Sequence, residues 1–207
     1  LFRSEATNAL GTSTSDEESF TTVVNNYCAS YGNTDYDTGI TLVSLAGINN
    51  STPSNKVVGY SDFACTHSAT LEQGRSYDLS VNVNTDGGFT IEAVAWIDFN
   101  GDGDFIDAEE EFYLGSAEDT DNGPTSLSPL KIDVPIGASA GSTRMRVSAR
   151  YNAEPTPCLE DFDGEVEDYE IVIIPASLPT VSEIRINEVD SDTPGADDAE
   201  FVELFSG

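Results

Sequence analysis

Basic residues are scarce in this sequence. Its 207 residues include only 8 Lys and Arg against 38 Asp and Glu, which gives a formal net charge of −30 at pH 7. Nucleic acids and anionic lipid surfaces are bound through Lys and Arg contacts that this chain can hardly supply, so we expect no nucleic-acid partner. The same charge makes the folded chain repel itself, and bound cations would relieve that repulsion.

Long apolar runs are also missing. No stretch of about 18 or more apolar residues occurs, so we expect no membrane insertion. The sequence starts at Leu1 with a polar stretch and shows no signal peptide, which suggests a mature form or a piece of a longer protein.

Cysteine and histidine are few. Cys28, Cys65 and Cys158 fit none of the C-x-x-C metal or redox spacings, so a disulfide is the better interpretation, and it favours an oxidising compartment, extracellular or periplasmic. The odd number leaves the pairing open. The single histidine, His67, lies two residues after Cys65, but such neighbours seldom form a nucleophile–base pair. We therefore predict no catalytic residues and no enzyme activity, except as an accessory part of a larger secreted enzyme.

The acidic residues, by contrast, form a recognisable pattern. Residues 98–109 read DFNGDGDFIDAE and fill every fixed position of the loop D-x-[DN]-x-[DN]-G-x5-E, which wraps one calcium ion. Calcium prefers about six to eight oxygen ligands. The predicted ligands are the side chains of Asp98, Asn100, Asp102 and Glu109 and the backbone carbonyl of Asp104. The alternative is a solvated acidic turn, because Asn-Gly and Asp-Gly are also hairpin residues.

The residues around this loop indicate a β-protein. The preceding segment 90–97 (TIEAVAWI) is β-branched and apolar without a helical period, so the loop is not part of an EF-hand helix pair. Similar runs, separated by turn residues, occur at 40–45, 77–83, 111–114, 127–134, 143–151 and 167–174. This spacing predicts an all-β fold, an antiparallel β-sandwich of the jelly-roll or immunoglobulin-like type with an inserted calcium-binding loop, and no helix.

The chain divides into four predicted segments. They are a linker or the tail of a preceding domain (1–26), the sandwich (27–174), a Pro-containing linker (175–182) and the beginning of another β-domain (183–207). The last segment offers only two strand candidates, 183–189 and 200–205, too few for a stable sheet. It must be completed by further sequence or by a partner, and homo-oligomers formed by strand exchange are the structural alternative.

Charged residues follow the alternation of two strands. The segment 143–151 places Arg144, Arg146 and Arg150 on one face, whereas Glu167 falls on an apolar face of its own strand. An unpaired carboxylate is costly there. We predict a structural ion pair between Glu167 and Arg144 or Arg146, since guanidinium binds carboxylate in a bidentate geometry. The alternative is that all these charges face water.

Several separated motifs together resemble the GEVED domain, over about residues 27–174. They are Tyr27-Cys28, the run 95–105, the strand 142–147, Pro157-Cys158 and the pentapeptide 164–168 (GEVED). The resemblance implies a β-sandwich accessory module of secreted and cell-surface proteins of Bacteroidota-type bacteria, often beside proteases and adhesion modules. It also implies a disulfide between Cys28 and Cys158, whereas Cys65 departs from the family pattern. The segments 184–190 and 199–204 resemble the opening strands of a lamin-tail-type domain.

Four tyrosines are candidates for ligand contacts. Tyr27, Tyr31, Tyr36 and Tyr60 lie near Gly, Asn and Asp, so they could stack on sugars or contact a protein surface, or else simply pack the sandwich edge. Together, these patterns predict a non-catalytic, calcium-stabilised extracellular accessory or adhesion module. Its partners would be other domains of the same polypeptide and a glycan or extracellular protein ligand, unless it only spaces its neighbours.

Overall fold

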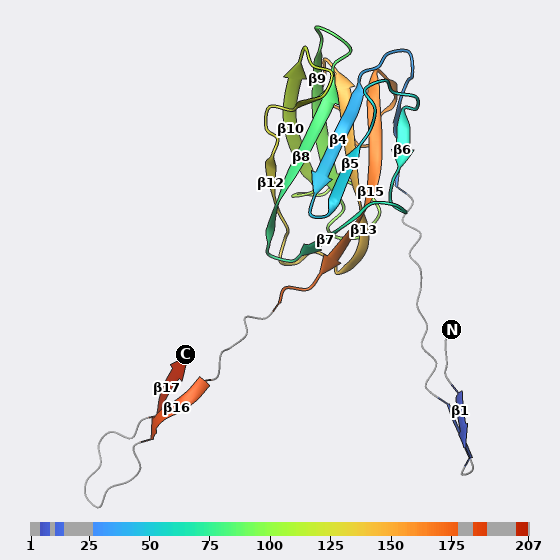
Figure 1. Cartoon of the computed structure of the whole chain (residues 1–207). Helices are drawn as coiled ribbons and strands as arrows, with labels where there is room; N and C mark the ends of the chain where they lie inside the picture. The colour runs from blue at the N-terminus through green and yellow to red at the C-terminus, as the bar shows by residue number, and fades with distance from the viewer. Residues whose placement is uncertain (1–4, 9–10, 15–26, 178–183, 190–201, 207) are drawn as a thin grey trace, which may run out of the picture. The chain divides into compact units, whose positions relative to one another are not determined.

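Two β-sheets packed face to face make up the main part of the chain (Figure 1). The computed structural model describes residues 5–8, 11–14, 27–177, 184–189 and 202–206. Within those ranges the chain forms strands and turns but no helix, as predicted. The described residues accordingly include no helix that could cross a membrane.

The first sheet has six strands. Its order is β10 (Glu111–Glu118), β9 (Thr90–Ile97), β13 (Gly141–Tyr151), β15 (Gly164–Ile174) and β6 (Tyr60–Asp62), with β7 (Ser68–Glu72) also paired to β15. The second sheet is ordered β11 (Gly123–Pro124), β8 (Ser76–Asn84), β4 (Gly39–Leu45) and β5 (Ile48–Ser51), with β12 (Leu130–Asp133) also paired to β8. A short parallel pair joins β3 (Tyr31–Gly32) to β14 (Glu160–Phe162).

The first sheet is buried on both faces. Its inner face meets the second sheet in the main core, to which β9 contributes Ala93 and Ala95, and β13 contributes Met145 and Val147. Along β13 the next residues in the alternation are buried as well, including Arg146, which is 2 % exposed. Other segments of the chain must therefore pack on the outer face of this sheet, and the candidate site lies in one of them, the connection between β9 and β10.

The structure corrects the predicted strands in three ways. β15 pairs in parallel with β6 and β7, so the sandwich is not purely antiparallel. The sequence patterns missed β5, β6 and β7, which are short and rich in polar residues, because pairing with a neighbour defines them more than their own alternation does. The strand predicted at 127–134 spans only Leu130–Asp133, after Pro129, which has no N–H to donate to a ladder.

The chain divides into two units, 1–174 and 175–207. In the second, β16 (Ile184–Val189) pairs with β17 (Val202–Ser206) as an antiparallel hairpin, close to the predicted strand candidates. Near the N-terminus, β1 (Glu5–Asn8) and β2 (Gly11–Thr14) form another hairpin within the segment predicted as a linker. The rest of that segment and most of the predicted linker 175–182 lie outside the described residues.

Candidate metal centre

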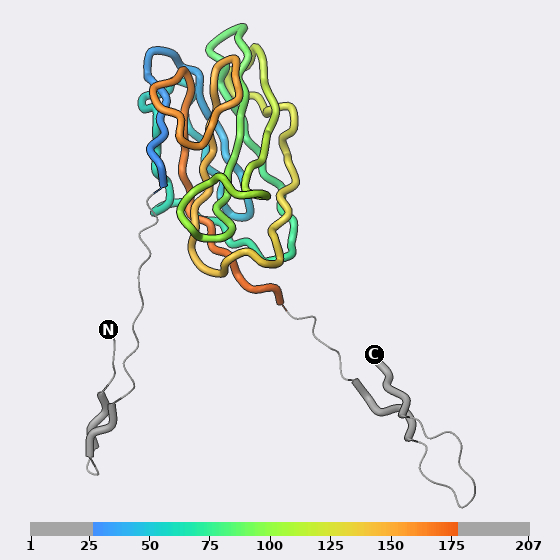
Figure 2. Tube along the Cα trace, turned by 180° about the vertical axis from the view of Figure 1, so that it is seen from behind, coloured from blue at the N-terminus to red at the C-terminus, as the bar shows by residue number. Residues whose placement is uncertain are grey.

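The connection between β9 and β10, residues 98–110, folds back over the outer face of the first sheet (Figure 2). Its Phe105 is buried against Val94 and Trp96, two β9 residues that point away from the main core. The ring of Tyr27 stacks on Phe105 with centroids 4.8 Å apart. These contacts fix the loop on the sheet through apolar packing.

Asp98 organises the start of the loop. Its carboxylate is fully buried and accepts hydrogen bonds from the N–H of Gly101 (2.6 Å), the N–H of Gly103 (3.1 Å) and the hydroxyl of Tyr27 (2.7 Å). Gly101 and Gly103 have φ angles of 75° and 93°, a region that glycine enters at little cost. Glycine at these two positions, of which the sequence pattern fixes only Gly103, therefore lets the loop close around this carboxylate.

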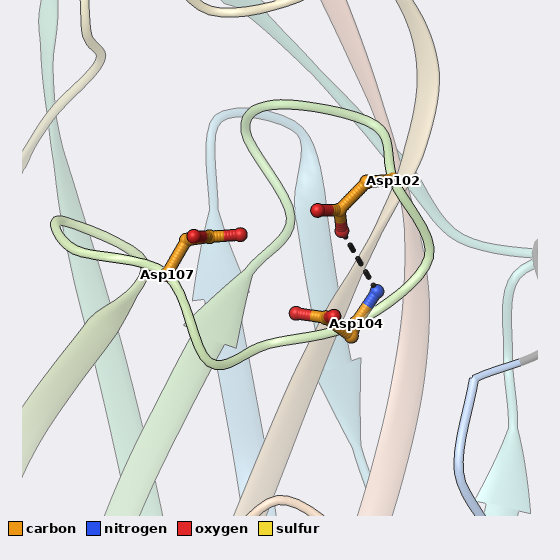
Figure 3. A group of neighbouring side chains, drawn as sticks. All are labelled: Asp102, Asp104 and Asp107. Carbon is orange, nitrogen blue, oxygen red and sulfur yellow. Dashed lines mark hydrogen bonds between the residues drawn. The ribbon is translucent and has the colours of Figure 1, made fainter.

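Three aspartates converge on the other side of the loop. One carboxylate oxygen each from Asp102, Asp104 and Asp107 lies within 4.8 Å of the others, and Figure 3 shows the three side chains directed toward a common space. The amide nitrogen of Asn100 donates to Asp102 (3.0 Å) and to Asp107 (2.8 Å), so a neutral donor bridges two of the three negative groups. An oxygen-rich, anionic set of this kind suits a hard divalent cation.

The acidic residues at the end of the loop separate into exposed and buried positions. Glu109 is exposed, whereas Glu110 is 1 % exposed and accepts a hydrogen bond from the N–H of Phe99 (2.9 Å) through one oxygen. Its other oxygen is buried without a hydrogen-bond partner among the described residues. Burial raises the pKa of Glu110, and the charges of Asp98 and Asp107 add to that rise. A carboxylate oxygen left in this state is costly unless a cation approaches it.

The predicted ligand set is thus only partly brought together. Asp102 belongs to the aspartate cluster and Asn100 bridges it, but neither Asp98 nor Glu109 is among the three clustered groups. Asp104 joins the cluster through its carboxylate, whereas the sequence pattern predicted its backbone carbonyl as the ligand. Asp107 was missed because the calcium-loop pattern leaves its position unspecified. The spacing of acidic residues at 102, 104 and 107 is the signal that could have pointed to it.

A second polar cluster lies on the same outer face. The carboxylate of Asp168, which is fully buried, accepts two hydrogen bonds from Arg146, both at 2.8 Å, and one from Arg144 at 3.2 Å. The hydroxyl of Tyr60 also donates to it at 3.0 Å. The paired geometry with Arg146 is the bidentate arrangement that makes guanidinium–carboxylate contacts strong.

Arg146 also contacts the segments that cover the sheet. Its remaining terminal nitrogen donates to the carbonyl oxygens of Cys28 (2.9 Å) and Pro157 (2.7 Å). Cys28 forms a disulfide with Cys158, which confirms the pairing implied by the family resemblance, and Cys65 is free and exposed. One arginine therefore joins β13, β15 and both ends of the disulfide-linked cover.

The predicted ion pair of Glu167 is wrong. The residue is buried on the apolar face as predicted, but it accepts a hydrogen bond from the hydroxyl of Tyr169 at 2.6 Å, and the arginines bind Asp168. Alternation explains the result. Arg144 and Arg146 point to the outer face together with Asp168, whereas Glu167 points between the sheets, where neither arginine can reach.

Two glutamates of β15 are therefore buried inside the sandwich without an arginine. Burial raises the pKa of Glu167 to about 8, and the nearby Glu165 adds to the rise. Burial also raises the pKa of Glu165 to about 7, although the N–H of Ile40 and the charge of Lys56 oppose it. Both groups bind protons more tightly in the folded chain than in an unfolded one.

The arrangement can now be compared with known families. Residues 92–172 match the GEVED domain family. The match runs from β9 to β15 and includes the acidic loop, the arginines of β13 and the Gly-Glu-Val-Glu-Asp sequence itself. No curated protein matched the chain.

Three residues of the GEVED sequence have identifiable structural roles here. A side chain on Gly164 would collide with the carbonyl oxygen of Ala149 on β13, so glycine is required for the two strands to approach. Glu165 accepts the N–H of Ile40 in the opposite sheet at 2.9 Å, and Asp168 binds the arginines. The matched sequence therefore joins β15 to the opposite sheet on one face and to the arginine cluster on the other.

Proposed function

We propose that residues 27–174 form a calcium-stabilised, non-catalytic accessory module of a larger secreted or cell-surface protein. The observation that carries the proposal is the convergence of Asp102, Asp104 and Asp107 on a loop whose sequence fits a calcium-binding pattern. The partnerless buried oxygen of Glu110 supports a cation in the same loop.

The calcium ion would be held by the carboxylates of the aspartate cluster, Asp102, Asp104 and Asp107. Bound there, the ion would supply positive charge to a loop that has only acidic ionisable side chains, in a chain with a net charge of −30. It would also hold the chain between β9 and β10 in one conformation. The proposed role is therefore structural, because calcium fixes the cover of the outer face and activates no water.

We expect removal of calcium to lower the melting temperature by several degrees. An ion that binds only the folded chain stabilises it by mass action, and the stabilisation disappears when the ion is chelated. Differential scanning fluorimetry in millimolar Ca²⁺, and again with excess EDTA, measures the difference. Asp102→Ala should melt at the same temperature in both conditions. Equal melting temperatures of the unmodified chain with and without Ca²⁺ would contradict the proposal.

The geometry also predicts which carboxylate near the end of the loop matters. Asp107→Asn should remove most of the calcium-dependent rise in melting temperature, because Asp107 belongs to the cluster. Glu109→Gln should retain it, because Glu109 is not one of the three clustered carboxylates. The two variants remove the same charge two residues apart, so each is the control for the other. The opposite ranking would favour the ligand set predicted from the sequence pattern.

The extracellular location is proposed from the disulfide between Cys28 and Cys158, since such bonds persist in oxidising compartments. The match to the GEVED domain family supports a role as an accessory part beside other domains. We propose that the parent protein is a surface protein of the Bacteroidota type. We propose that residues 183–207 begin a further, lamin-tail-like domain of the same polypeptide.

A second candidate function is assembly by strand exchange. It is supported by the hairpin of β16 and β17, since the two strands described in this unit are too few for a stable sheet. Pairing of this hairpin with another copy would then complete the sheet. Light scattering coupled to size exclusion tests this candidate, and a monomer at every concentration would exclude it.

A further inference from the structure

A pocket of about 480 Å³ lies on the outer face of the first sheet, at the arginine cluster. Its volume is within the range of roughly 300–1,000 Å³ found for small-ligand sites. The lining includes Tyr27, Tyr31 and Tyr60, three of the four tyrosines that the sequence pattern singled out, together with Arg144. Residues more than 100 positions apart in the sequence therefore meet in one concave surface.

The three tyrosines differ in how many contacts their side chains make with the rest of the chain. Tyr27 lies between Phe105, on which it stacks, and the guanidinium of Arg144, which is 5.3 Å from its ring centroid. The hydroxyl of Tyr60 donates a hydrogen bond to the buried Asp168, and Tyr60 is partly exposed and lines the pocket. Tyr31 is 41 % exposed. Its backbone N–H donates a hydrogen bond to the carbonyl oxygen of Leu159, whereas its side chain makes no hydrogen bond to the described residues. Tyr31 and Tyr60 are thus the rings available to a ligand.

Arg144 supplies hydrogen-bond donors at the same place. Its side chain is 26 % exposed, and only one of its nitrogens contacts the acidic groups of Asp168 and Asp62, at 3.2 and 3.6 Å. Its other nitrogens make no hydrogen bond to the described residues. Arg146, by contrast, uses its donors on Asp168 and on backbone carbonyls.

The charges around the pocket argue against an anionic ligand. Two arginines there are balanced by Asp168 and Asp62, and the whole chain carries a net charge of −30, so an anion gains little locally and is repelled at long range. Accessible aromatic rings beside uncommitted N–H donors favour a ligand with both C–H faces and hydroxyl groups.

We propose that this pocket binds neutral carbohydrate, with Tyr31 and Tyr60 packing against the sugar rings and Arg144 donating hydrogen bonds to hydroxyl groups. The proposal rests on the proposed function as an accessory module and names its ligand class. It requires no bound calcium for its chemistry, so the two proposals can fail separately.

The experiment uses the full chain with its disulfide intact. An array of neutral and uronic-acid-containing oligosaccharides identifies the probes that bind, and isothermal titration calorimetry then gives Kd for the strongest soluble probe. We expect binding to neutral probes in preference to acidic ones. Tyr31→Ala should weaken that binding about tenfold, the effect of losing one favourable ring contact. Tyr36→Ala is the matched control, since Tyr36 is 55 % exposed and does not line the pocket.

Three outcomes of the binding experiment would overturn the carbohydrate proposal. Binding that Tyr31→Ala leaves unchanged, or that Tyr36→Ala weakens equally, would place the carbohydrate elsewhere. A preference for acidic probes would contradict the charge argument, and an array without any bound probe would exclude the ligand class and favour a protein partner. The calcium proposal can fail by itself. If Ca²⁺ did not change the melting temperature but carbohydrate still bound in a Tyr31-dependent way, the calcium role would be contradicted and the carbohydrate proposal would remain supported.

Discussion

Arg146→Met should lower the free energy of unfolding by about 3–5 kcal/mol, the range found when one partner of a buried ion pair is removed. The substitution keeps much of the side-chain volume but leaves the buried carboxylate of Asp168 with the weaker contact to Arg144 and the hydroxyl of Tyr60. It also removes the donor to the carbonyl oxygens of Cys28 and Pro157. Urea unfolding followed by circular dichroism measures the change.

Arg150→Met provides the matched control for this prediction. Arg150 lies on the same strand and the same face, but its one hydrogen bond, to the carbonyl oxygen of Glu154, is exposed. Its replacement should change stability by no more than about 0.5 kcal/mol. In the double variant Arg146→Met with Asp168→Leu, most of the loss should be recovered, because no charge remains buried. Similar losses for the two single arginine variants would show that the buried cluster is not important for stability.

The second large effect is an unusual dependence of stability on pH. The pKa values of Glu165 and Glu167 are raised from 4.5 to about 7 and about 8, so the folded chain holds protons that the unfolded chain releases. Their contribution is fully present below about pH 4.5 and is lost as the pH rises to about 8. We expect the free energy of unfolding to fall by on the order of a few kcal/mol across this window. Urea titrations at successive pH values measure the slope.

Glu167→Gln should flatten that slope. Glutamine can still accept the hydroxyl of Tyr169 but cannot ionise, so the variant should be more stable than the unmodified chain at pH 9 and lose that advantage at pH 5. Glu170→Gln, on the opposite face of the same strand, removes an equal charge from a less buried position and should leave the slope unchanged. If Glu167→Gln and the unmodified chain had parallel pH profiles, the buried glutamate would not be responsible.

The alternation of side chains in the sequence predicts much of the fold. The predicted strand 90–97 matches β9 at both ends, because β-branched and apolar residues fill it and acidic turn residues follow it. The same reasoning placed Glu167 on an apolar face and the arginines of 143–151 together on one face, and both assignments are confirmed. The error was to join the two sets, since a strand directs its neighbouring residues to opposite faces.

The details of the candidate site depend on contacts that no local pattern contains. Tyr27 and Asp98 are 71 positions apart in the sequence, yet the hydroxyl of Tyr27 donates a hydrogen bond to the carboxylate of Asp98. Glu110 becomes buried where the loop folds over Val94 and Trp96. The spacing pattern, which named the neighbouring Glu109 as a ligand, gave no indication of this burial. Short polar strands such as β6 were not predicted because their pairing with a distant strand, here β15, defines them.

The bond between Cys28 and Cys158 closes a covalent ring from residues 130 positions apart, which includes most of the strands of both sheets. A single cut by a protease at any point between these cysteines opens the ring but releases no fragment. The two pieces would stay linked, migrate as one species without reductant and separate only once the bond is reduced. A module of the proposed kind could thus be nicked in a surface loop and remain attached to its parent polypeptide.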